Sequence, residues 1–218
     1  MEPLPHTPGK FAFFLRSIFD FQVITVKRHL KKCRINKGDK VLDVGAGLSP
    51  YKHLILESGG IYTGIDSNVS ADFKYDNKEI IKYDGINIPF EDNSFDWIIC
   101  TEVLEHVESP FDFTKELYRV GKNLFLTVPF SARFHYKPHD YFRFTPTTLT
   151  KMFSVFRDAE IMPRGNELTV ISNKLAVFSL NYPIFILILP FSILLGYISL
   201  LGLGSVDDPL GYSVIAKK

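Results

Sequence analysis

The ten residues VLDVGAGLSP (41–50) indicate the fold class of the chain. An apolar run is followed by Gly45 and Gly47, so a buried strand leads directly into a glycine loop. Such a loop allows the backbone to approach a bound nucleotide closely. However, Pro50 stands where a dinucleotide-binding loop has its third glycine, and Asp43 lies two residues before the first glycine.

Asp43 indicates which cofactor this loop serves. A carboxyl group in a buried strand costs at least about 2 kcal/mol unless it has a cationic or hydrogen-bonding neighbour. S-adenosylmethionine (SAM) carries an ammonium and a sulfonium group and has no phosphate to be held by a helix N-terminus. Ser49 is then expected as the N-cap, and Pro50 as the first residue, of the next helix. The sequence therefore predicts SAM rather than a dinucleotide.

Apolar strands alternate with helical stretches over most of the remaining chain. This alternation predicts a doubly wound α/β sheet with helices on both faces. Strands are expected at 40–44, 61–65, 80–83, 95–100, 123–128 and 211–218, and helices at 50–58, at 110–119 and after Thr145-Pro146. Residues 11–34 are expected to form one amphipathic helix, with Phe14, Ile18, Phe21 and Thr25 on one face.

Further polar residues stand where these strands end. Asp66 follows Gly47 by 19 positions (66 − 47), the place for a carboxylate that accepts the ribose hydroxyls. Asp84 could contact the adenine amino group. The predicted cofactor-binding residues are Asp43, Gly45, Ala46, Gly47, Asp66, Ser67, Asp84, Gly85, Thr101 and Glu102.

Several motifs together resemble the class I SAM-dependent methyltransferases, and among them the type-11 methyltransferase domain family. They are DVGAG (43–47), GID (64–66), YDGxxxPFxDNSFD (83–96), TEVLEHV (101–107) and ELYRVGK (116–122). The resemblance covers about residues 38–162, and residues 211–218 match the final strand. It implies a Rossmann-like sheet of seven strands in the order 3-2-1-4-5-7-6, the last strand antiparallel, and methyl transfer by in-line displacement at sulfur. Ser49 replaces the family's common third glycine, a position that mainly shapes the turn.

The acceptor is expected to bind at the loop 129–145, which follows the fifth strand. Candidate proton acceptors are His135, His139 and Tyr141, together with His106. Alternatively, Arg143 pairs with Asp140 and the aromatic side chains pack the loop. Since orientation can supply most of the rate of methyl transfer, no residue is assigned as catalytic.

Glu102, Glu105 and His106 have i, i+3, i+4 spacing, so on a helix they would share one face. Two carboxylates and an imidazole could hold a divalent metal. The alternative that we adopt is that they position the cofactor or the turn, so no metal is expected.

The segment of about residues 175–206 contains no charged residue, since none occurs between Lys174 and Asp207. If 211–218 joins the sheet, both ends of this segment lie on one side of any membrane. We therefore expect a helical hairpin, bent near Pro190, that touches a membrane through 183–204. An oligomer interface, a substrate lid and an ordinary core helix pair are the alternatives. The basic residues of 27–40 could face anionic lipid or form a solvated helix end.

Two domains or regions are expected: an N-terminal helical region (1–37) and the methyltransferase domain (38–218). The net charge of +1 and the single basic cluster make nucleic acid an unlikely partner. Two cysteines and no signal peptide indicate a cytoplasmic protein, located at the cytoplasmic face of a membrane, and an oligomer remains open. The predicted activity is SAM-dependent O-methylation of a small or lipid-linked acceptor. The alternatives are a noncatalytic SAM-binding module or a nicotinamide-dependent oxidoreductase.

Overall fold

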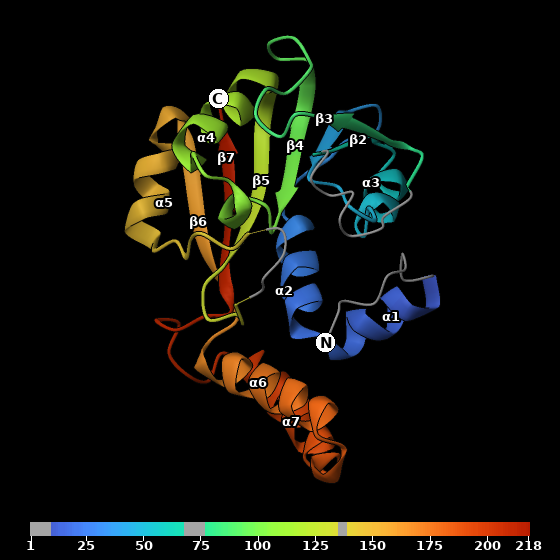
Figure 1. Cartoon of the computed structure of the whole chain (residues 1–218), viewed down its shortest axis with the longest axis vertical. Helices are drawn as coiled ribbons and strands as arrows, with labels where there is room; N and C mark the ends of the chain where they lie inside the picture. Colours follow the sequence, from blue (N-terminus) through green and yellow to red (C-terminus); the bar gives the residue numbers. More distant parts are fainter. Residues whose placement is uncertain (1–9, 68–76, 135–138) are drawn as a thin grey trace.

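A seven-stranded sheet forms the centre of the computed structural model, which describes residues 10–67, 77–134 and 139–218 (Figure 1). The strand order is β3-β2-β1-β4-β5-β7-β6, with only β7 antiparallel to its neighbours, which confirms the predicted topology. The strands are β1 (Lys40–Val44), β2 (Ile61–Ser67), β3 (Ile80–Tyr83), β4 (Phe95–Thr101), β5 (Gly121–Pro129), β6 (Asp158–Arg164) and β7 (Gly211–Lys217). Only β6 had no expected residue range.

Successive side chains of the central strands enter two separate apolar layers. On β5, Leu124 and Leu126 belong to one layer and Phe125 to the other. Helices α4 (Pro110–Val120) and α5 (Pro146–Met152), with the 3₁₀-helix η3 (Phe153–Val155), cover the first layer. Helices α2 (Phe21–Leu30) and α3 (Lys52–Glu57) cover the second. Both faces of the sheet are thus buried, as expected for a parallel sheet.

The single N-terminal helix expected over residues 11–34 is wrong. The chain forms α1 (Lys10–Phe19) and α2, which are separated at Asp20. Asp20 has extended backbone dihedrals, and its carboxylate accepts a hydrogen bond from the Gln22 amide at 3.0 Å. Asp is among the residues that most favour the N-cap, so a second helix starts here.

The helix after the glycine loop also starts later than expected. Helix α3 begins at Lys52, and Tyr51 occupies its N-cap position, so Ser49 is not the N-cap and Pro50 is not the first helical residue. Ser49 instead has a φ of 53°, in the left-handed region that favours glycine. This backbone conformation explains why a glycine is common at this position in the family that the sequence resembles.

A helical hairpin connects β6 to β7, and Figure 1 shows it projecting beyond the sheet. It consists of α6 (Glu167–Asn181), the 3₁₀-helix η4 (Pro183–Phe185) and α7 (Ile188–Ser199). The bend therefore precedes the expected position at Pro190. Pro190 lies in the first turn of α7, where its missing amide hydrogen costs no helical bond. None of the helices within the described ranges combines the length and the apolarity that crossing a bilayer requires.

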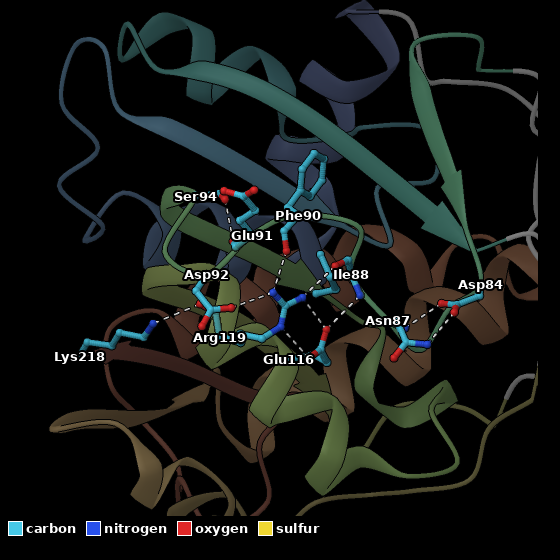
Figure 2. A network of polar contacts seen from close by, with 10 residues as sticks. All are labelled: Asp84, Asn87, Ile88, Phe90, Glu91, Asp92, Ser94, Glu116, Arg119 and Lys218. Carbon is cyan, nitrogen blue, oxygen red and sulfur yellow. Dashed lines mark hydrogen bonds and ion pairs between the residues drawn. The ribbon is translucent and has the colours of Figure 1, made fainter.

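Arg119 of α4 fixes the loop between β3 and β4 (Figure 2). Its guanidinium donates to the carbonyls of Ile88 (2.9 Å) and Phe90 (2.7 Å) and to the carboxylates of Glu116 (2.8 and 2.9 Å) and Asp92 (3.0 Å). The Glu116 carboxylate also accepts from the Ile88 amide at 3.1 Å. The ELYRVGK motif thus has a structural role here: its arginine and glutamate hold the loop that leads into β4.

Candidate functional site

The glycine loop after β1 is shaped by close contacts with two neighbouring strand ends. Gly45 has a φ of 72°, and a Cβ atom there would lie 2.3 Å from Cγ2 of Val103. The Gly47 amide donates to a carboxylate oxygen of Asp66 at 3.1 Å. A side chain at position 45 would therefore displace the segment after β4, and the loop lies against the end of β2.

Asp43 is a buried carboxyl group whose environment leaves its charge uncompensated. Only 3% of the residue is exposed, and the Tyr62 hydroxyl donates to Oδ2 at 2.8 Å. Burial raises the pKa of Asp43 to about 7, the Tyr62 hydrogen bond opposes this, and the charge of Asp66 adds to it. Tyr62 is the hydrogen-bonding neighbour that the sequence required, but a neutral hydroxyl does not offset the burial. A cation beside Asp43 would stabilise its ionised form.

Asp66 lies in β2 and Asp84 directly follows β3, and the two aspartates differ in burial. Asp66 is buried and accepts from the amides of Gly47 and Ser67. Asp84 is exposed and forms a turn, since it accepts from the amides of Ile86 and Asn87 at 2.8 and 2.7 Å. These bonds lower the pKa of Asp84. Its carboxylate thus also holds its own turn, and the contact with adenine stays a prediction.

Glu102 follows Thr101 at the end of β4 and is bound to a buried arginine. Its φ of 54° is unusual for a residue with a side chain, and its carboxylate accepts from Thr127 Oγ1 at 2.8 Å. Arg164, the last residue of β6, donates to the same oxygen at 2.6 Å and to the Val128 carbonyl at 3.1 Å. Strained backbone of this kind persists only where the surroundings hold it. Arg164 thus positions Glu102.

Arg164 is a residue that the sequence analysis missed. Its side chain is completely buried, and its second terminal nitrogen donates to Gln22 Oε1 of α2 at 3.3 Å. A charged residue at the end of a strand and directly before Gly165 was the available signal. Because residues 158–164 were not recognised as a strand, Arg164 could not be assigned to the edge of the sheet where the predicted site lies.

The expected helical face of Glu102, Glu105 and His106 does not form. Only Leu104–His106 is helical, as the 3₁₀-helix η2. Glu105 is fully buried, and neither carboxyl oxygen has a hydrogen-bond partner, although His106 Nε2 lies 3.7 Å from Oε1. Burial, with the nearby Glu102, raises the pKa of Glu105 well above its usual range. Within the described residues, no three His, Cys, Asp or Glu side chains are grouped to hold a metal ion.

The described part of the loop after β5 lies against η2. The His106 ring, through Nδ1, bonds to the carbonyl of His139, and the Tyr141 hydroxyl donates to Glu108 Oε1 at 3.0 Å. His139 and Tyr141 are exposed, with ring centroids 5.4 Å apart. His135 falls outside the described residues. The loop therefore brings three of the four candidate proton acceptors together.

The predicted alternative for this loop is confirmed in one respect. Arg143 forms a two-bond ion pair with Asp140, and the second bond measures 2.7 Å. This pair holds the loop ahead of α5, whose N-cap is Thr145. Asp140 and Arg143 thus have a structural function, and the histidines and Tyr141 remain the chemical groups of the loop.

The predicted cofactor residues converge at one edge of the sheet. β1, β2, β3 and β4 are mutually parallel, so the residues at their carboxyl ends lie at the same edge of the sheet, where open α/β sheets bind ligands. The basic cluster does not lie there: Arg28, Lys31, Lys32 and Arg34 follow or end α2, and Lys40 begins β1 at the opposite edge. The hairpin follows the carboxyl end of β6, so the basic cluster and the hairpin are not neighbours.

Comparisons with known proteins agree with this arrangement. Residues 42–124 match the methyltransferase domain family. A demethylmenaquinone methyltransferase from Geobacillus sp. (strain WCH70) is 30% identical over 158 residues, which cover 61% of this chain and 67% of the relative. An uncharacterised protein of Methanocaldococcus jannaschii is 35% identical over 94 residues, 43% of this chain. The chain spans only 41% of the length of that relative.

The fold is shared with a solved structure. A SAM-dependent methyltransferase from Archaeoglobus fulgidus superimposes with a TM-score of 0.59 at 18% identity. The match covers 96% of this chain and 100% of the other. At this identity the likeness concerns the fold alone.

Proposed function

We propose that this chain, which belongs to the class I SAM-dependent methyltransferases, transfers a methyl group to a small or lipid-linked acceptor at a membrane surface. The observation that carries the use of SAM is Asp43: a buried carboxyl group with a pKa of about 7 at the end of β1, beside a glycine loop. The apolar hairpin carries the part that concerns the acceptor.

The donor set at the sheet edge fits SAM. Asp43 would pair with the cationic amino-acid end, and a cation would offset the burial that raises its pKa. Gly45, Ala46 and Gly47 would pass close to the cofactor, and Asp66 with Ser67 would hold the ribose. Asp84, whose oxygens also hold its own turn, keeps the predicted contact with the adenine amino group, because an exposed carboxylate has further lone pairs.

Bound SAM supplies an electrophilic methyl group on a sulfonium. The chain's own contribution is orientation, since a well-placed nucleophile already gains most of the rate. His106, His139 and Tyr141, which lie together in the structure, would take a proton from a hydroxyl acceptor, for which we propose O-methylation. This role distinguishes them from Asp43, which serves binding.

A lipid-linked acceptor is supported by the hairpin and by one relative. The hairpin follows the carboxyl end of β6, at the sheet edge of the predicted cofactor residues, and has no charged residue between Lys174 and Asp207. The relative from Geobacillus is named for demethylmenaquinone, a prenylated quinone. We therefore propose contact with the cytoplasmic face of a membrane through 183–204.

The deciding experiment is incubation of the full chain with SAM labelled in its methyl group and fractionated cell extract. Label in the lipid fraction supports the proposal. Label in a water-soluble fraction keeps the methyltransferase but removes the lipid acceptor. SAM binding by calorimetry with no label in any fraction would favour the noncatalytic alternative, and NADH binding without SAM binding would favour an oxidoreductase.

A further inference from the structure

Helix α1 exposes aromatic and aliphatic side chains that no other element covers in the described chain. Phe14 is 58% exposed, Leu15 39% and Phe19 48%. By contrast, α2 buries Val23, Val26 and Leu30 against the sheet, and Phe21 against Val170 of α6 and Leu210. The break at Asp20 thus separates a core helix from a helix whose apolar side chains face outward.

Helix α1 is joined to the hairpin. The Tyr197 hydroxyl of α7 donates to the Ile18 carbonyl at 2.6 Å, and its ring meets Phe21 edge-on, with 5.5 Å between centroids. Gly196 allows this approach, because a Cβ there would lie 2.1 Å from the Phe21 ring. The exposed side chains of α1 and α7 therefore belong to one connected assembly of helices.

This assembly lies at the edge of the sheet where the cofactor residues converge. Gln22, in the first turn of α2, is bonded to Arg164 at the carboxyl end of β6. Helix α1 directly precedes that turn, and α6 follows Arg164 by three residues. Figure 1 shows α1, α6 and α7 beyond the carboxyl ends of the strands.

The charges and exposures favour a lipid surface as the occupant. Arg16, the charged side chain described on α1, is paired with Asp20 at 2.8 Å. At the hairpin tip Ile184 is 85% and Leu187 87% exposed, so almost the whole of each side chain is free on all sides. Acyl chains can surround such a tip, whereas a flat protein face would cover one side. The 12 residues of α7 measure about 18 Å, close to one leaflet of about 15 Å.

We propose that α1 is an interfacial helix that binds the bilayer together with the hairpin, so that two contacts turn the cofactor edge toward the membrane. This inference rests on the membrane contact in the proposed function. The hairpin would enter the leaflet, and α1 would lie at the boundary of headgroups and acyl chains. Neither contact alone would fix the orientation of the domain.

The test uses the full chain, whose single tryptophan, Trp97, is buried. Phe19→Trp, Leu187→Trp and the control Phe111→Trp each add one exposed reporter. Phe111 on α4 is 46% exposed, a close match to Phe19. Each variant is mixed with phosphatidylcholine and phosphatidylglycerol vesicles that carry bromine either near the headgroup or near the end of the acyl chain.

We expect headgroup-side bromine to quench the Phe19→Trp variant most strongly, deep bromine to quench Leu187→Trp, and neither to quench Phe111→Trp. If Leu187→Trp is quenched and Phe19→Trp is not, the inference on α1 is wrong while the hairpin contact stands. If neither is quenched, the membrane contact of the proposed function fails as well. Equal quenching of Phe111→Trp would indicate unspecific adsorption and overturn the inference.

A second variant measures the contribution of α1 to binding. Phe14→Ser with Phe19→Ser should weaken flotation with the vesicles at least about tenfold, since two phenyl groups leave the interface. Phe111→Ser should not weaken it. SAM affinity, measured by calorimetry, should be the same in the double variant and in Phe111→Ser as in the unchanged chain, which would show that the variants fold. Unchanged flotation of the double variant would refute the role of α1.

Discussion

Asp43 and Asp84 show how two aspartates in similar sequence positions differ in the folded chain. Each stands near the carboxyl end of a parallel strand, but Asp43 is buried with a pKa raised to about 7, and Asp84 is exposed with a lowered pKa. Three hydrogen bonds within its own turn lower the pKa of Asp84. Asp43 has one bond, from a neutral hydroxyl. Of these two aspartates, Asp43 is therefore the one whose charge needs a cationic ligand.

The first prediction at this scale concerns pH. Below about pH 7 the Asp43 carboxyl is protonated and neutral, and above it ionised, so the affinity for SAM should rise between about pH 6 and pH 7.5. Asp43→Asn should lower the affinity at pH 7.5 by about 10- to 100-fold, the value of a charge-assisted hydrogen bond, and should flatten the rise. Calorimetry with SAM measures both.

Asp96 provides the control for this prediction. It lies at the amino end of β4, where it accepts from the Lys40 amide and from Lys122. Asp96→Asn should leave SAM affinity and its pH dependence unchanged. Equal losses in the two variants would show that Asp43 acts through stability rather than through the ligand.

The second residue-scale prediction concerns the pair of Arg164 and Glu102. Arg164→Met should lower the free energy of unfolding by about 3 kcal/mol, the lower end for breaking a buried ion pair, because Glu102 is partly exposed. SAM affinity should fall too, since Glu102 loses the group that holds it. Arg157→Met, which breaks an exposed pair with Asp158, should cost less than about 1 kcal/mol. Urea unfolding measures both losses. Equal losses of unfolding free energy in the two variants would contradict the role of Arg164 in holding Glu102.

At the scale of elements, the loop from β3 to β4 depends on a helix that follows it in the chain. Arg119 and Glu116 of α4 supply the bonds that hold the Ile88 and Phe90 backbone. A motif that identifies a family can thus record a structural requirement. The residues of DNSF (92–95) lie in the turn before β4, and Arg119 bonds to the Asp92 carboxylate.

Arg119→Met should therefore destabilise the fold by about 2 kcal/mol, because two carbonyls and two carboxylates lose their donor. Lys115→Met removes a pair with Asp112 on the same helix, where both side chains are more than 70% exposed, and should cost at most about 0.5 kcal/mol. Thermal unfolding of both variants measures these two stability losses. A loss for Arg119→Met no larger than that of the control would remove the anchor role.

Helices α1 and α2 illustrate what periodicity misses at this scale. The face of Phe14, Ile18, Phe21 and Thr25 is regular, and it predicted one continuous helix. In the fold, Phe21 and Thr25 are buried and Phe14 is exposed. The N-cap preference of Asp20 was visible in the sequence, but it becomes decisive only when α2 packs on the sheet.

At the scale of the whole molecule, the hairpin is the feature that sets this chain apart from a plain seven-stranded domain. Its base is fixed by Asn166, whose side chain donates to the carbonyls of Ser199 (3.1 Å) and Leu203 (2.7 Å). Its two arms meet through small polar side chains, and Ser172 donates to the Ser192 carbonyl at 2.6 Å. The base is thus well bonded, while the tip is exposed.

The whole-molecule prediction follows from this contrast. Ile184→Ser with Leu187→Ser should sharply weaken vesicle flotation without lowering stability, since both side chains are at least 85% exposed. The control is Leu56→Ser with Ile61→Ser, which removes two exposed apolar groups of the same kind outside the hairpin, although these are less exposed, at 50% and 56%. Flotation that is equally strong in both double variants would refute insertion of the tip.

The sequence by itself determined six of the seven strands, the glycine loop and the acids near it. Buried strands read as continuous apolar runs, and the loop needs glycines at alternate positions, Gly45 and Gly47, so both properties are local. The order of the strands followed from the resemblance to the methyltransferase family. The division at residue 37 and the roles of the site residues remain predictions.

Only the tertiary structure decided which distant groups meet. Arg164 donates a hydrogen bond to Glu102, 62 positions away in the chain, and the Tyr62 hydroxyl donates one to Asp43. The basic cluster lies at the sheet edge opposite the hairpin. The Glu105 carboxyl group also proved to be buried without a hydrogen bond rather than aligned with Glu102. Periodicity records which side of an element is buried, but a partner is selected by the packing of elements far apart in the chain. Charges and hydrogen bonds at the site follow that packing.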